Sequence, residues 1–571
     1  MQNSLPRIRI ILIGVGILIL SLVIIIRLFM LQVLHHSEYV EKGKKQYSTF
    51  QGDAFDRGAI YFTAKDGTRV LAAATTVGYK LAITPKLVAP KKDEIYEKLN
   101  AITPIDKATF LQKVARTDDP YEEIAYKLNQ DQAQAVRALK FTGVDVFNQS
   151  WRFYPGENLA SRLLGFVSYQ GDKLSGRYGL ERQYDAVLVR NQKQSYSNFF
   201  AEVFNTIRGI VSSPGEEEGS LVTTIEPTVQ AHIEETLRTM SDKYHPSEVG
   251  AIVMNPKNGE IIAMAVLPDY NVNEFNKVDN VSIFNNPIVE NVYELGSVVK
   301  SLTMSSGLDA GVVTPETTYN DKGYIILNTE RINDFDKKAR GIVTMQDVLN
   351  NSLNTGATFV MQQLGRERFK NYMLSFGIGE KTGVDVPGEV KSLIGNLKIT
   401  RDLEYATASF GQGIALTPIA AIRAFASLAN GGYIITPHVV RAIEHTDGTV
   451  HTLSFPEPKQ VLKKETTETI SRMLTTVIDK GMFGGRAKLA HYSVAAKTGT
   501  AQVARPDGKG YYDDIFLHSM FGYYPAYDPQ FITLFYIVDP KGVEYALNTL
   551  GHSFMDTASF LMTYYEVAPD R

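Results

Sequence analysis

The hydrophobic pattern of the chain begins with one long apolar stretch near the N-terminus. Every residue from 10 to 26 is apolar, glycine or serine, and after Arg27 the chain is again largely apolar up to residue 34. A membrane-spanning helix needs roughly 17–25 such residues. Residues 10–34 are therefore predicted to form a transmembrane helix. Arg7 and Arg9 precede it, which favours a cytoplasmic N-terminus.

A cleaved signal peptide is the alternative interpretation of this stretch. Cleavage requires small residues of the Ala-x-Ala kind after the apolar core, whereas here the bulky residues 28–34 follow. We therefore expect a retained signal anchor, with about 535 of the 571 residues outside the cytoplasm.

The pattern after the anchor changes once along the chain. Residues 35 to about 218 mix short strand-like runs with turns, and residues 104–140 are predicted to be helical and charged. From residue 219 the pattern is more regular. Residues 250–254 and 261–266 flank an Asn-Gly turn, which predicts an antiparallel hairpin. Further strands are predicted at 519–523 and 531–538, and helices after 297 and over 345–364, 418–429, 465–479 and 557–565.

Strands at both ends of this region, with helices between them, predict an α/β or α+β domain of about 350 residues. The segment before it contains Ser-Ser-Pro-Gly and three glutamates, which is typical of an exposed loop. The predicted organisation has four parts: a cytoplasmic N-terminus (1–9), an anchor (10–34), a β-rich region (35–218) and the α+β domain (219–571).

Composition excludes several classes of function. Lys+Arg number 59 against 62 Asp+Glu, a net charge of -3, which lacks the concentrated basic field that nucleic-acid binding requires. With no cysteine, the chain has no disulfides, Cys-ligated zinc, iron–sulfur clusters or Cys nucleophiles. The ten histidines are scattered and form no His-Glu-x-x-His motif. We expect no metal and no other cofactor.

Three short motifs follow one another in the last region. The first places Ser297 three residues before Lys300. A serine hydroxyl is a weak nucleophile until a base takes its proton, and residues three apart share one face of a helix. Lys300 is therefore the candidate base. It can act only when neutral, so burial and a nearby cation such as Lys497 must lower its pKa to ~7–8.

The other two motifs supply polar groups to the same chemistry. Ser352-Leu353-Asn354 is expected to relay the proton to the leaving group through Ser352 and to hold Lys300 in place through Asn354. Lys497-Thr498-Gly499-Thr500 follows a small apolar run, which suits an edge strand. Its cation and hydroxyls are suited to a substrate carboxylate, and its glycine permits close approach of a substrate backbone. A backbone N–H of this strand and that of Ser297 are predicted to form an oxyanion hole.

Each motif, taken by itself, is explained by chance or by local structure, since serine often caps helices and Thr-Gly often forms turns. Lys-Thr-Gly indeed occurs a second time, at Lys381, in a loop-like context without a preceding strand. We assign Lys381 to a turn and Lys497 to the site. The occurrence of all three motifs in this order favours a catalytic site.

This order resembles that of penicillin-binding proteins and β-lactamases. Other stretches extend the resemblance over nearly the whole chain, so that it is similar to a class B penicillin-binding protein, a monofunctional peptidoglycan D,D-transpeptidase. Leu295 departs from the proline usual in the family, and Leu353 from aspartate. The matching stretches are Arg57-Gly58-Ala59-Ile60, residues 178–185, residues 255–260, residues 383–389, Gly411-Gln412-Gly413 with Thr417-Pro418, and residues 521–525.

The resemblance implies a non-catalytic pedestal, similar to a dimerisation domain, at 35–218. It implies a penicillin-binding or β-lactamase-like transpeptidase fold at 219–571, with an antiparallel sheet, flanking helices and an all-α subdomain. Ser297 would form an acyl-enzyme with D-Ala-D-Ala stem peptides and pass it to an acceptor amine. The implied roles are base for Lys300, proton network for Ser352, Asn354 and Lys497, substrate binding for Thr498, Gly499 and Thr500, and oxyanion hole for the N–H groups of Ser297 and Thr500.

Location and partners are also implied by the resemblance. The protein would be a single-pass protein of the bacterial cytoplasmic membrane, with an extracytoplasmic catalytic domain. Its partners would be peptidoglycan stem peptides, β-lactams as covalent inhibitors, a SEDS-family glycan polymerase and other divisome or elongasome proteins. The moderate pedestal, single anchor and lack of an appended module resemble the division-specific branch. The alternatives are an elongation-specific transpeptidase, a D,D-carboxypeptidase or β-lactamase-type hydrolase, and a non-enzymatic β-lactam sensor or scaffold.

Overall fold

The computed structural model describes residues 18, 22, 56–171, 173–190, 218–505 and 510–571. The predicted N-terminus (1–9), nearly all of the predicted anchor (10–34) and the loop over 191–217 lie outside these residues. Among the described residues, no helix combines the length and the apolar character needed to cross a membrane. The described residues form two compact units, the first centred on residues 76–151 and the second on 57–75 and the described part of 152–571.

The first unit is built around a small sheet covered by helices. The second half of β2 (Arg69–Ile83) pairs antiparallel with β3 (Glu122–Leu128), and β4 (Val144–Phe153) also pairs with β2. Its core buries Leu81 and Phe110 completely. Its helices are α3 (Pro85–Val88), α4 (Lys92–Asn100), α5 (Lys107–Val114) and α6 (Gln130–Ala138).

The prediction of helix throughout 104–140 is wrong over β3. The buried residues of this strand, Glu122, Ala125 and Leu128, lie three apart and so imitate the spacing of a helix face. Register shifts in the pairing with β2 break the strict alternation that usually identifies a strand. Only this pairing, which the local pattern does not reveal, makes the segment extended.

The second unit begins with a sheet whose strands come from distant parts of the chain. Its strands in this unit are ordered β16-β15-β7-β1-β2, with β1 parallel to β7 and the other pairs antiparallel. The strands beside β2 are β1 (Ile60–Thr63), β7 (Gly219–Thr223), β15 (Val440–His445) and β16 (Val450–Thr452). The same unit contains β5 (Val167–Gln170), β6 (Lys173–Gly176), α7 (Ser161–Leu164), α8 (Gly179–Gln183) and α9 (Asp185–Leu188).

A buried network of charges holds this part of the unit together. Arg57 Nε lies 2.6 Å from Glu181 Oε2, and Arg57 Nη1 lies 2.7 Å from Asp185 Oδ1. Arg152 Nε pairs with the other oxygen of Glu181 at 2.6 Å, and the Tyr154 hydroxyl donates to that oxygen as well. The side chains of Arg57 and Glu181 are fully inaccessible to solvent. Burial opposes the ionisation of Glu181, but the two guanidinium groups hold its pKa below the ordinary value.

The central element of the second unit is a five-stranded antiparallel sheet, ordered β18-β19-β20-β8-β9. Both of its faces are buried. Along β20, Phe535 and Ile537 face one core, whereas Leu534 and Tyr536 face the other, as the two-residue period of a strand requires. The strands are β8 (Glu248–Met254), β9 (Ile261–Leu267), β18 (Ala495–Ala504), β19 (Tyr511–Tyr524) and β20 (Phe531–Val538).

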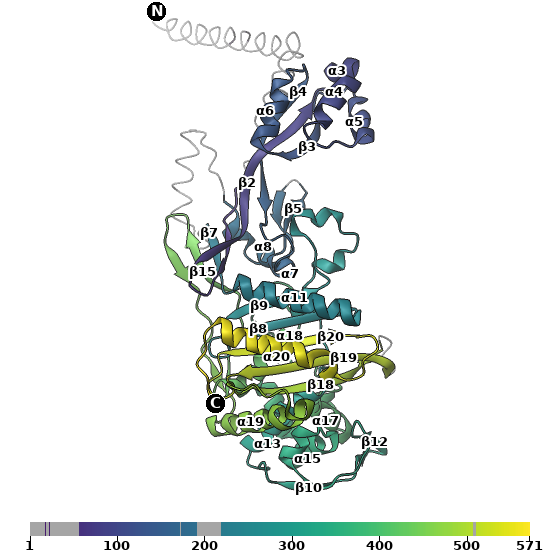
Figure 1. Ribbon diagram of the computed structural model, residues 1–571, viewed down its shortest axis with the longest axis vertical. Helices are drawn as coiled ribbons and strands as arrows, with labels where there is room; N and C mark the ends of the chain where they lie inside the picture. The colour runs from purple at the N-terminus through teal and green to yellow at the C-terminus, as the bar shows by residue number, and fades with distance from the viewer. Residues whose placement is uncertain (1–17, 19–21, 23–55, 172, 191–217, 506–509) are drawn as a thin grey trace, which may run out of the picture. The chain divides into compact units, whose positions relative to one another are not determined.

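Helices cover this sheet on both faces (Figure 1). On one face, α11 (Pro227–Tyr244) and α20 (Ala546–Tyr564) share a core with the sheet. On the other, α18 (Pro418–Ala429) packs against it, and the ring of Phe425 stacks on Phe521 with centroids 3.9 Å apart. The mixed α+β architecture and the Asn-Gly hairpin, formed by β8 and β9, are thereby confirmed.

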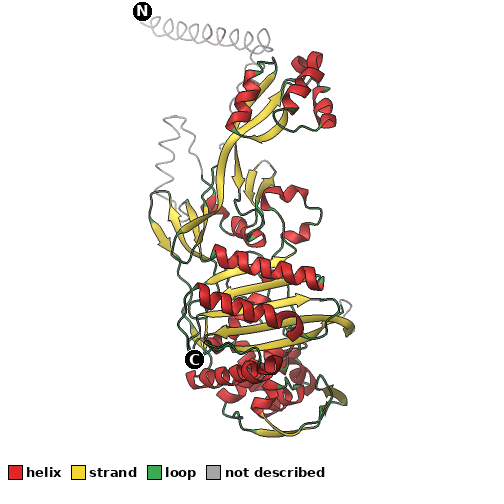
Figure 2. Cartoon of the chain, viewed as in Figure 1, coloured by secondary structure: helices red, strands yellow, loops and turns green. Residues whose placement is uncertain are grey.

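Most of the remaining helices gather on one side of the five-stranded sheet (Figure 2), where α19 packs against the edge strand β18. The expectation of an all-α subdomain is wrong in detail, because two small antiparallel sheets lie within it, β10 with β13 and β11 with β12. Asn328 and Thr329 take left-handed backbone angles at the tight turn between β11 and β12. These strands are β10 (Thr318–Asp321), β11 (Tyr324–Leu327), β12 (Glu330–Asn333) and β13 (Gly341–Thr344). The helices are α12 (Pro287–Glu290), α13 (Lys300–Asp309), α14 (Met345–Asn350), α15 (Asn354–Leu364), α16 (Arg366–Ser375), α17 (Asp402–Ser409) and α19 (Lys464–Thr476).

The buried charge network makes a prediction about stability. Glu181→Gln removes the carboxylate that Arg57 and Arg152 share and leaves Arg57 only Asp185, and removing one partner of a buried ion pair costs about 3–5 kcal/mol. We expect a clear fall in the denaturation midpoint of the full chain. Glu566→Gln is the matched control, because Glu566 pairs with Lys65 at the surface with 82% of its side chain exposed. Equal midpoints for the two variants would contradict the structural role of Glu181.

Candidate active site

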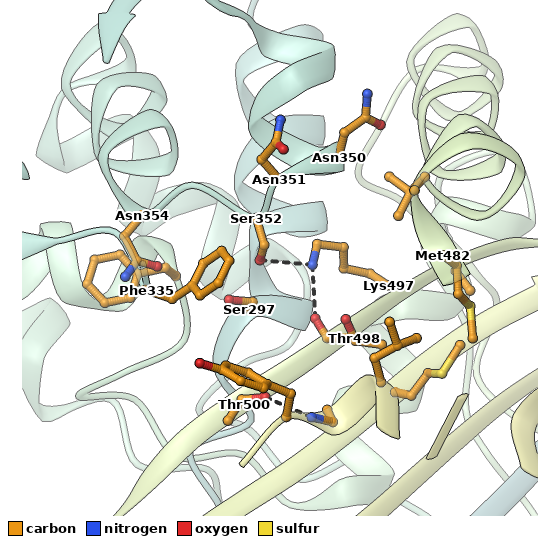
Figure 3. Close-up of a pocket in the computed structure, with 18 of the residues that line it drawn as sticks. Ser297, Phe335, Asn350, Asn351, Ser352, Asn354, Met482, Lys497, Thr498 and Thr500 are labelled. Carbon is orange, nitrogen blue, oxygen red and sulfur yellow. Dashed lines mark hydrogen bonds between the residues drawn. The ribbon is translucent and has the colours of Figure 1, made fainter. Parts of the chain in front are cut away.

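A cavity of about 680 Å³ lies between the edge strand β18 and the helices beside it, and residues of all three predicted motifs line it (Figure 3). Two other predicted site residues, Lys300 and Gly499, are not among the residues that line it. The lining includes six of the predicted site residues, Ser297, Ser352, Asn354, Lys497, Thr498 and Thr500.

Ser297 lies at the start of a helix whose entry is a tight glycine turn. The 3-10 turn η5 (Gly296–Val299) carries Ser297 and runs directly into α13. Gly296 has φ of 65°, and its N–H donates to the carbonyl of Gly411 at 3.2 Å. A Cβ on Gly411 would lie 2.1 Å from the Gly296 oxygen, so this approach requires glycine. The turn places Ser297 where unpaired helix N–H groups favour negative charge.

Strand β18 approaches this turn closely. A Cβ on Gly499 would lie 2.3 Å from the carbonyl oxygen of Leu295, and the Ser519 hydroxyl donates to the same oxygen at 2.6 Å. The close approach predicted at Gly499 is therefore made by the protein's own backbone. Leu295, which stands where the family has proline, is fixed by that hydrogen bond and by complete burial. The approach of a substrate at Gly499 stays a prediction.

Lys300 is buried among polar atoms that do not neutralise its charge. Only 1% of the residue is exposed, and Nζ donates to the Ser352 carbonyl at 2.5 Å and to the Ser352 hydroxyl at 3.3 Å. Burial lowers its pKa well below the ordinary value, and the charge of Lys497 lowers it further, while Asp334 acts in the opposite direction. The lowered pKa favours the neutral amine, whose lone pair can accept a proton.

Lys497 approaches Ser352 from the other side. Its Nζ donates to Ser352 Oγ at 3.0 Å and to the Thr498 carbonyl at 3.0 Å (Figure 3). Burial lowers the pKa of Lys497 to about 7. A hydroxyl oxygen accepts two hydrogen bonds and donates one. Because both lone pairs of Ser352 Oγ face lysine nitrogens, its hydrogen is free to be donated to another group.

The backbone at Ser352 is what places its oxygen atoms. Ser352 has φ of 53°, a left-handed conformation that costs a non-glycine residue about 1–3 kcal/mol. It interrupts the helix predicted over 345–364 and separates α14 from α15. Leu353 is completely buried between its two polar neighbours, which explains an apolar residue at the centre of this motif.

Asn354 occupies the first position of α15. Its amide nitrogen donates to the carbonyl of Asn333 at 2.8 Å and so links the helix to the end of β12. The hydrogen bonds described for Lys300 go to Ser352, so the direct support of Lys300 by Asn354 stays a prediction.

The hydroxyls of the third motif line the cavity along β18. Thr500 Oγ1 accepts the N–H of Ala546 at 3.2 Å, which ties β18 to the start of α20. Thr498 lies nearer Lys497 (Figure 3). As an edge strand, β18 leaves backbone N–H groups on one side without strand partners. The oxyanion hole predicted from the N–H groups of Ser297 and Thr500 uses such a group and stays a prediction.

The second Lys-Thr-Gly lies elsewhere, as expected for a turn. Lys381 is exposed and does not line the cavity. The buried Thr382 hydroxyl donates to Glu389 at 2.6 Å, so this copy of the motif closes a loop.

The sequence did not indicate several residues at the cavity. Phe335 and Tyr545 lie at its rim with ring centroids 6.1 Å apart, and they are 58% and 43% exposed. Asp334 lies just behind the wall against Thr355. These residues come from loops and helix ends, and no local pattern marks them.

The chain was compared with known proteins. The model of the penicillin binding protein transpeptidase domain matches residues 249–555, and that of the penicillin-binding protein dimerisation domain matches residues 54–217. Stage V sporulation protein D of Bacillus subtilis is 30% identical over 502 residues, covering 86% of this chain and 74% of that protein. Peptidoglycan D,D-transpeptidase FtsI of Escherichia coli is 27% identical over 430 residues, covering 74% and 68%.

Solved structures share the fold. Penicillin binding protein 3 from Mycobacterium tuberculosis, in its apo form, superposes with a TM-score of 0.65 at 25% identity, covering 74% of this chain and 92% of that one. Penicillin Binding Protein 2X from Streptococcus thermophilus superposes with a TM-score of 0.71 at 20% identity, covering 90% and 81%.

The contact between Gly499 and Leu295 makes a second prediction. In Gly499→Ala the new methyl group overlaps the Leu295 carbonyl, so β18 must move away from the turn of Ser297 at a cost of about 1–3 kcal/mol. We expect faster hydrogen exchange in peptides covering 495–504 and 295–300.

Gly395→Ala is the matched control, because a Cβ at Gly395 would meet nothing within 4 Å and its backbone is not left-handed. Exchange that is equally slow in Gly499→Ala and in the unaltered protein would show that the contact does not hold the strand in place.

Proposed function

Because the chain belongs to the class B penicillin-binding proteins, we propose that it is a serine peptidoglycan D,D-transpeptidase that cross-links the cell wall. Ser297 attacks the carbonyl of the penultimate D-Ala of a stem peptide and releases the terminal D-Ala. The resulting ester is then attacked by an amine of a neighbouring stem peptide. The observation that carries this proposal is the cavity lined by Ser297, Ser352 and Lys497, together with the hydrogen bonds that Lys497 and the buried Lys300 both donate to Ser352.

Lys300 is the base of the first step. Its helical position relative to Ser297 and its lowered pKa suit removal of the Ser297 proton as the ester forms. The leaving nitrogen of D-Ala must gain a proton. The Ser352 hydroxyl is suited to deliver it, since its oxygen accepts from both lysines and its hydrogen is free. In this step Ser352 donates its own hydrogen and recovers one from a lysine.

The third motif binds the end of the donor peptide. Lys497, when protonated, and the hydroxyls of Thr498 and Thr500 form a set of hydrogen-bond donors suited to the terminal carboxylate. The N–H groups of Ser297 and Thr500 complete the oxyanion hole. Gly499 keeps the strand against the nucleophile. β-Lactams, which join a carboxylate to a strained amide, acylate Ser297 by the same route.

The cellular setting of this reaction is part of the proposal. Residues 10–34 anchor the chain in the bacterial cytoplasmic membrane with residues 1–9 in the cytoplasm. Residues 35–218 form the non-catalytic pedestal and 219–571 the extracytoplasmic transpeptidase domain. The pedestal contacts a SEDS-family glycan polymerase and other envelope proteins. Likeness to proteins named FtsI and Stage V sporulation protein D supports a role in septation.

Labelling with a fluorescent penicillin tests the nucleophile. We expect Ser297→Ala to label only at background, because the hydroxyl proposed to form the ester is gone. Ser301→Ala is the matched control on the same helix, since the buried Ser301 hydroxyl has no hydrogen-bond partner and its loss costs little. Undiminished labelling of Ser297→Ala would refute the assignment. Rapid release of the bound label would instead indicate a hydrolase.

The two lysines predict a bell-shaped pH dependence for acylation. The second-order rate constant for acylation by penicillin rises with pH as Lys300 loses its proton. It falls again as Lys497, whose pKa is lowered to about 7 by burial, loses the charge that binds the carboxylate. Lys497→Arg keeps its charge at high pH, so the alkaline limb should disappear in the activity that remains. An alkaline limb unchanged in this variant would assign it to another group.

A further inference from the structure

Two buried carboxyl groups lie beneath the start of α15, directly behind the Ser352 motif. Asp321 ends β10, Asp334 follows β12, and each residue is only 1% exposed. Asp334 accepts the backbone N–H of Thr355 at 3.1 Å, and the neighbouring Asn333 carbonyl accepts the Asn354 amide. The end of β12 therefore fixes the first turn of α15, which in turn fixes Ser352.

The Thr355 hydroxyl lies between the two carboxyl groups. Three oxygens surround Thr355 Oγ1, namely Asp334 Oδ2 at 2.9 Å, the Tyr319 hydroxyl at 3.0 Å and Asp321 Oδ1 at 3.3 Å. A hydroxyl has one hydrogen, so Thr355 can donate to only one of the two carboxyl groups at a time, while Tyr319 can donate to Thr355. The second carboxyl oxygen then faces a lone pair of Thr355, and a proton on that carboxyl group would turn the approach into a hydrogen bond.

A counter-charge and a backbone donor lie beside Asp321. Its Oδ2 lies 3.6 Å from Arg340 Nη1, and its Oδ1 accepts the N–H of Gly323 at 2.7 Å. Arg340, just before β13, is shared with Asp336, which turns away from the pair. The other charged or titratable groups that face Asp334 are Tyr319 on β10 and Lys300 on α13, with Lys497 on β18 beyond Lys300.

We propose that Asp334 is a positioning residue of the active site, held as a neutral acid that shares a single proton with Asp321. In this form it fixes Thr355 and the start of α15 without placing a second negative charge near Lys300. The inference rests on the proposed function only in assigning Lys300 as the base. Burial raises the pKa of Asp334 and Asp321 adds to the rise, while the hydrogen bonds of Thr355 oppose it.

The charge of Asp334 affects how strongly Lys300 holds its proton. A negative charge on Asp334 stabilises the ammonium form of Lys300, because Asp334 acts on the pKa of Lys300 in the upward direction. A neutral Asp334 withholds that stabilisation. The pair therefore provides the hydrogen bonds that order the site and leaves Lys300 free to act as a base.

Infrared difference spectroscopy on the full chain in detergent tests the protonation directly. We expect the C=O band of a protonated carboxyl group in the unaltered protein and its loss in Asp334→Asn, whose amide can still donate to Thr355. A spectrum in which Asp334→Asn removes no such band overturns the proposal. This measurement needs no catalytic activity, so it decides the question even if Ser297 fails to react with penicillin.

The pH profile of penicillin acylation tests the effect on Lys300. The acid limb of the profile is the rise in rate at low pH that follows deprotonation of Lys300. In Asp334→Asn this rise should occur at the same pH, since one neutral group replaces another. In Asp321→Asn the pair loses its charge, Asp334 ionises, and the acid limb should move up by about one pH unit. Glu330→Gln, an exposed charge change at the start of β12, is the matched control and should move nothing.

The same pH profile can also contradict the proposal. An acid limb that moves to lower pH in Asp334→Asn would mean that Asp334 is ionised in the native enzyme and would refute the proposal. If Asp321→Asn does not fold, the infrared comparison of the unaltered protein with Asp334→Asn decides alone. Absence of any Ser297 labelling, with the carboxyl band present, would refute the proposed function and leave the shared proton intact.

Discussion

The site depends on the burial of two lysine ammonium groups against one serine hydroxyl. Lys300 and Lys497 both donate to Ser352 Oγ, and neither is paired with a carboxylate in that arrangement. Transfer of a charged group from water into such a place is costly, so the protein favours the neutral amine. Burial thereby favours the neutral form of Lys300, whose lone pair can take a proton.

Backbone contacts hold this arrangement in place. Gly499 and Gly411 allow β18 and the loop after α17 to approach the turn of Ser297 more closely than any side chain would permit. Ser352 adopts a left-handed conformation and so points its carbonyl and hydroxyl at Lys300. Strain at Ser352 is tolerated because Leu353 is buried beside it and α15 begins immediately afterwards. Precision here comes from the fold rather than from the three motifs alone.

Local patterns predicted the parts of the structure that local chemistry determines. The Asn-Gly turn identified β8 and β9, and the small apolar run before Lys497 identified an edge strand. The sequence could not predict what depends on distant partners. β3 is a strand because of its pairing with β2, and Asp334 meets Asp321 only through two small sheets and Thr355. The backbone of Ser352 likewise results from packing, since serine has no intrinsic preference for that conformation.

The chain buries charge in two ways, and the comparison explains what the catalytic site requires. Around Glu181 each charge meets a counter-charge, so Arg57 and Arg152 remain ionised and act as structural links. Around Ser352 no carboxylate among the described residues pairs with either lysine, so the pKa values of both are lowered. An ionised Asp334 would bring the second arrangement closer to the first, because its charge raises the pKa of Lys300. A protonated Asp334 keeps its hydrogen bonds to Thr355 without that effect on the base.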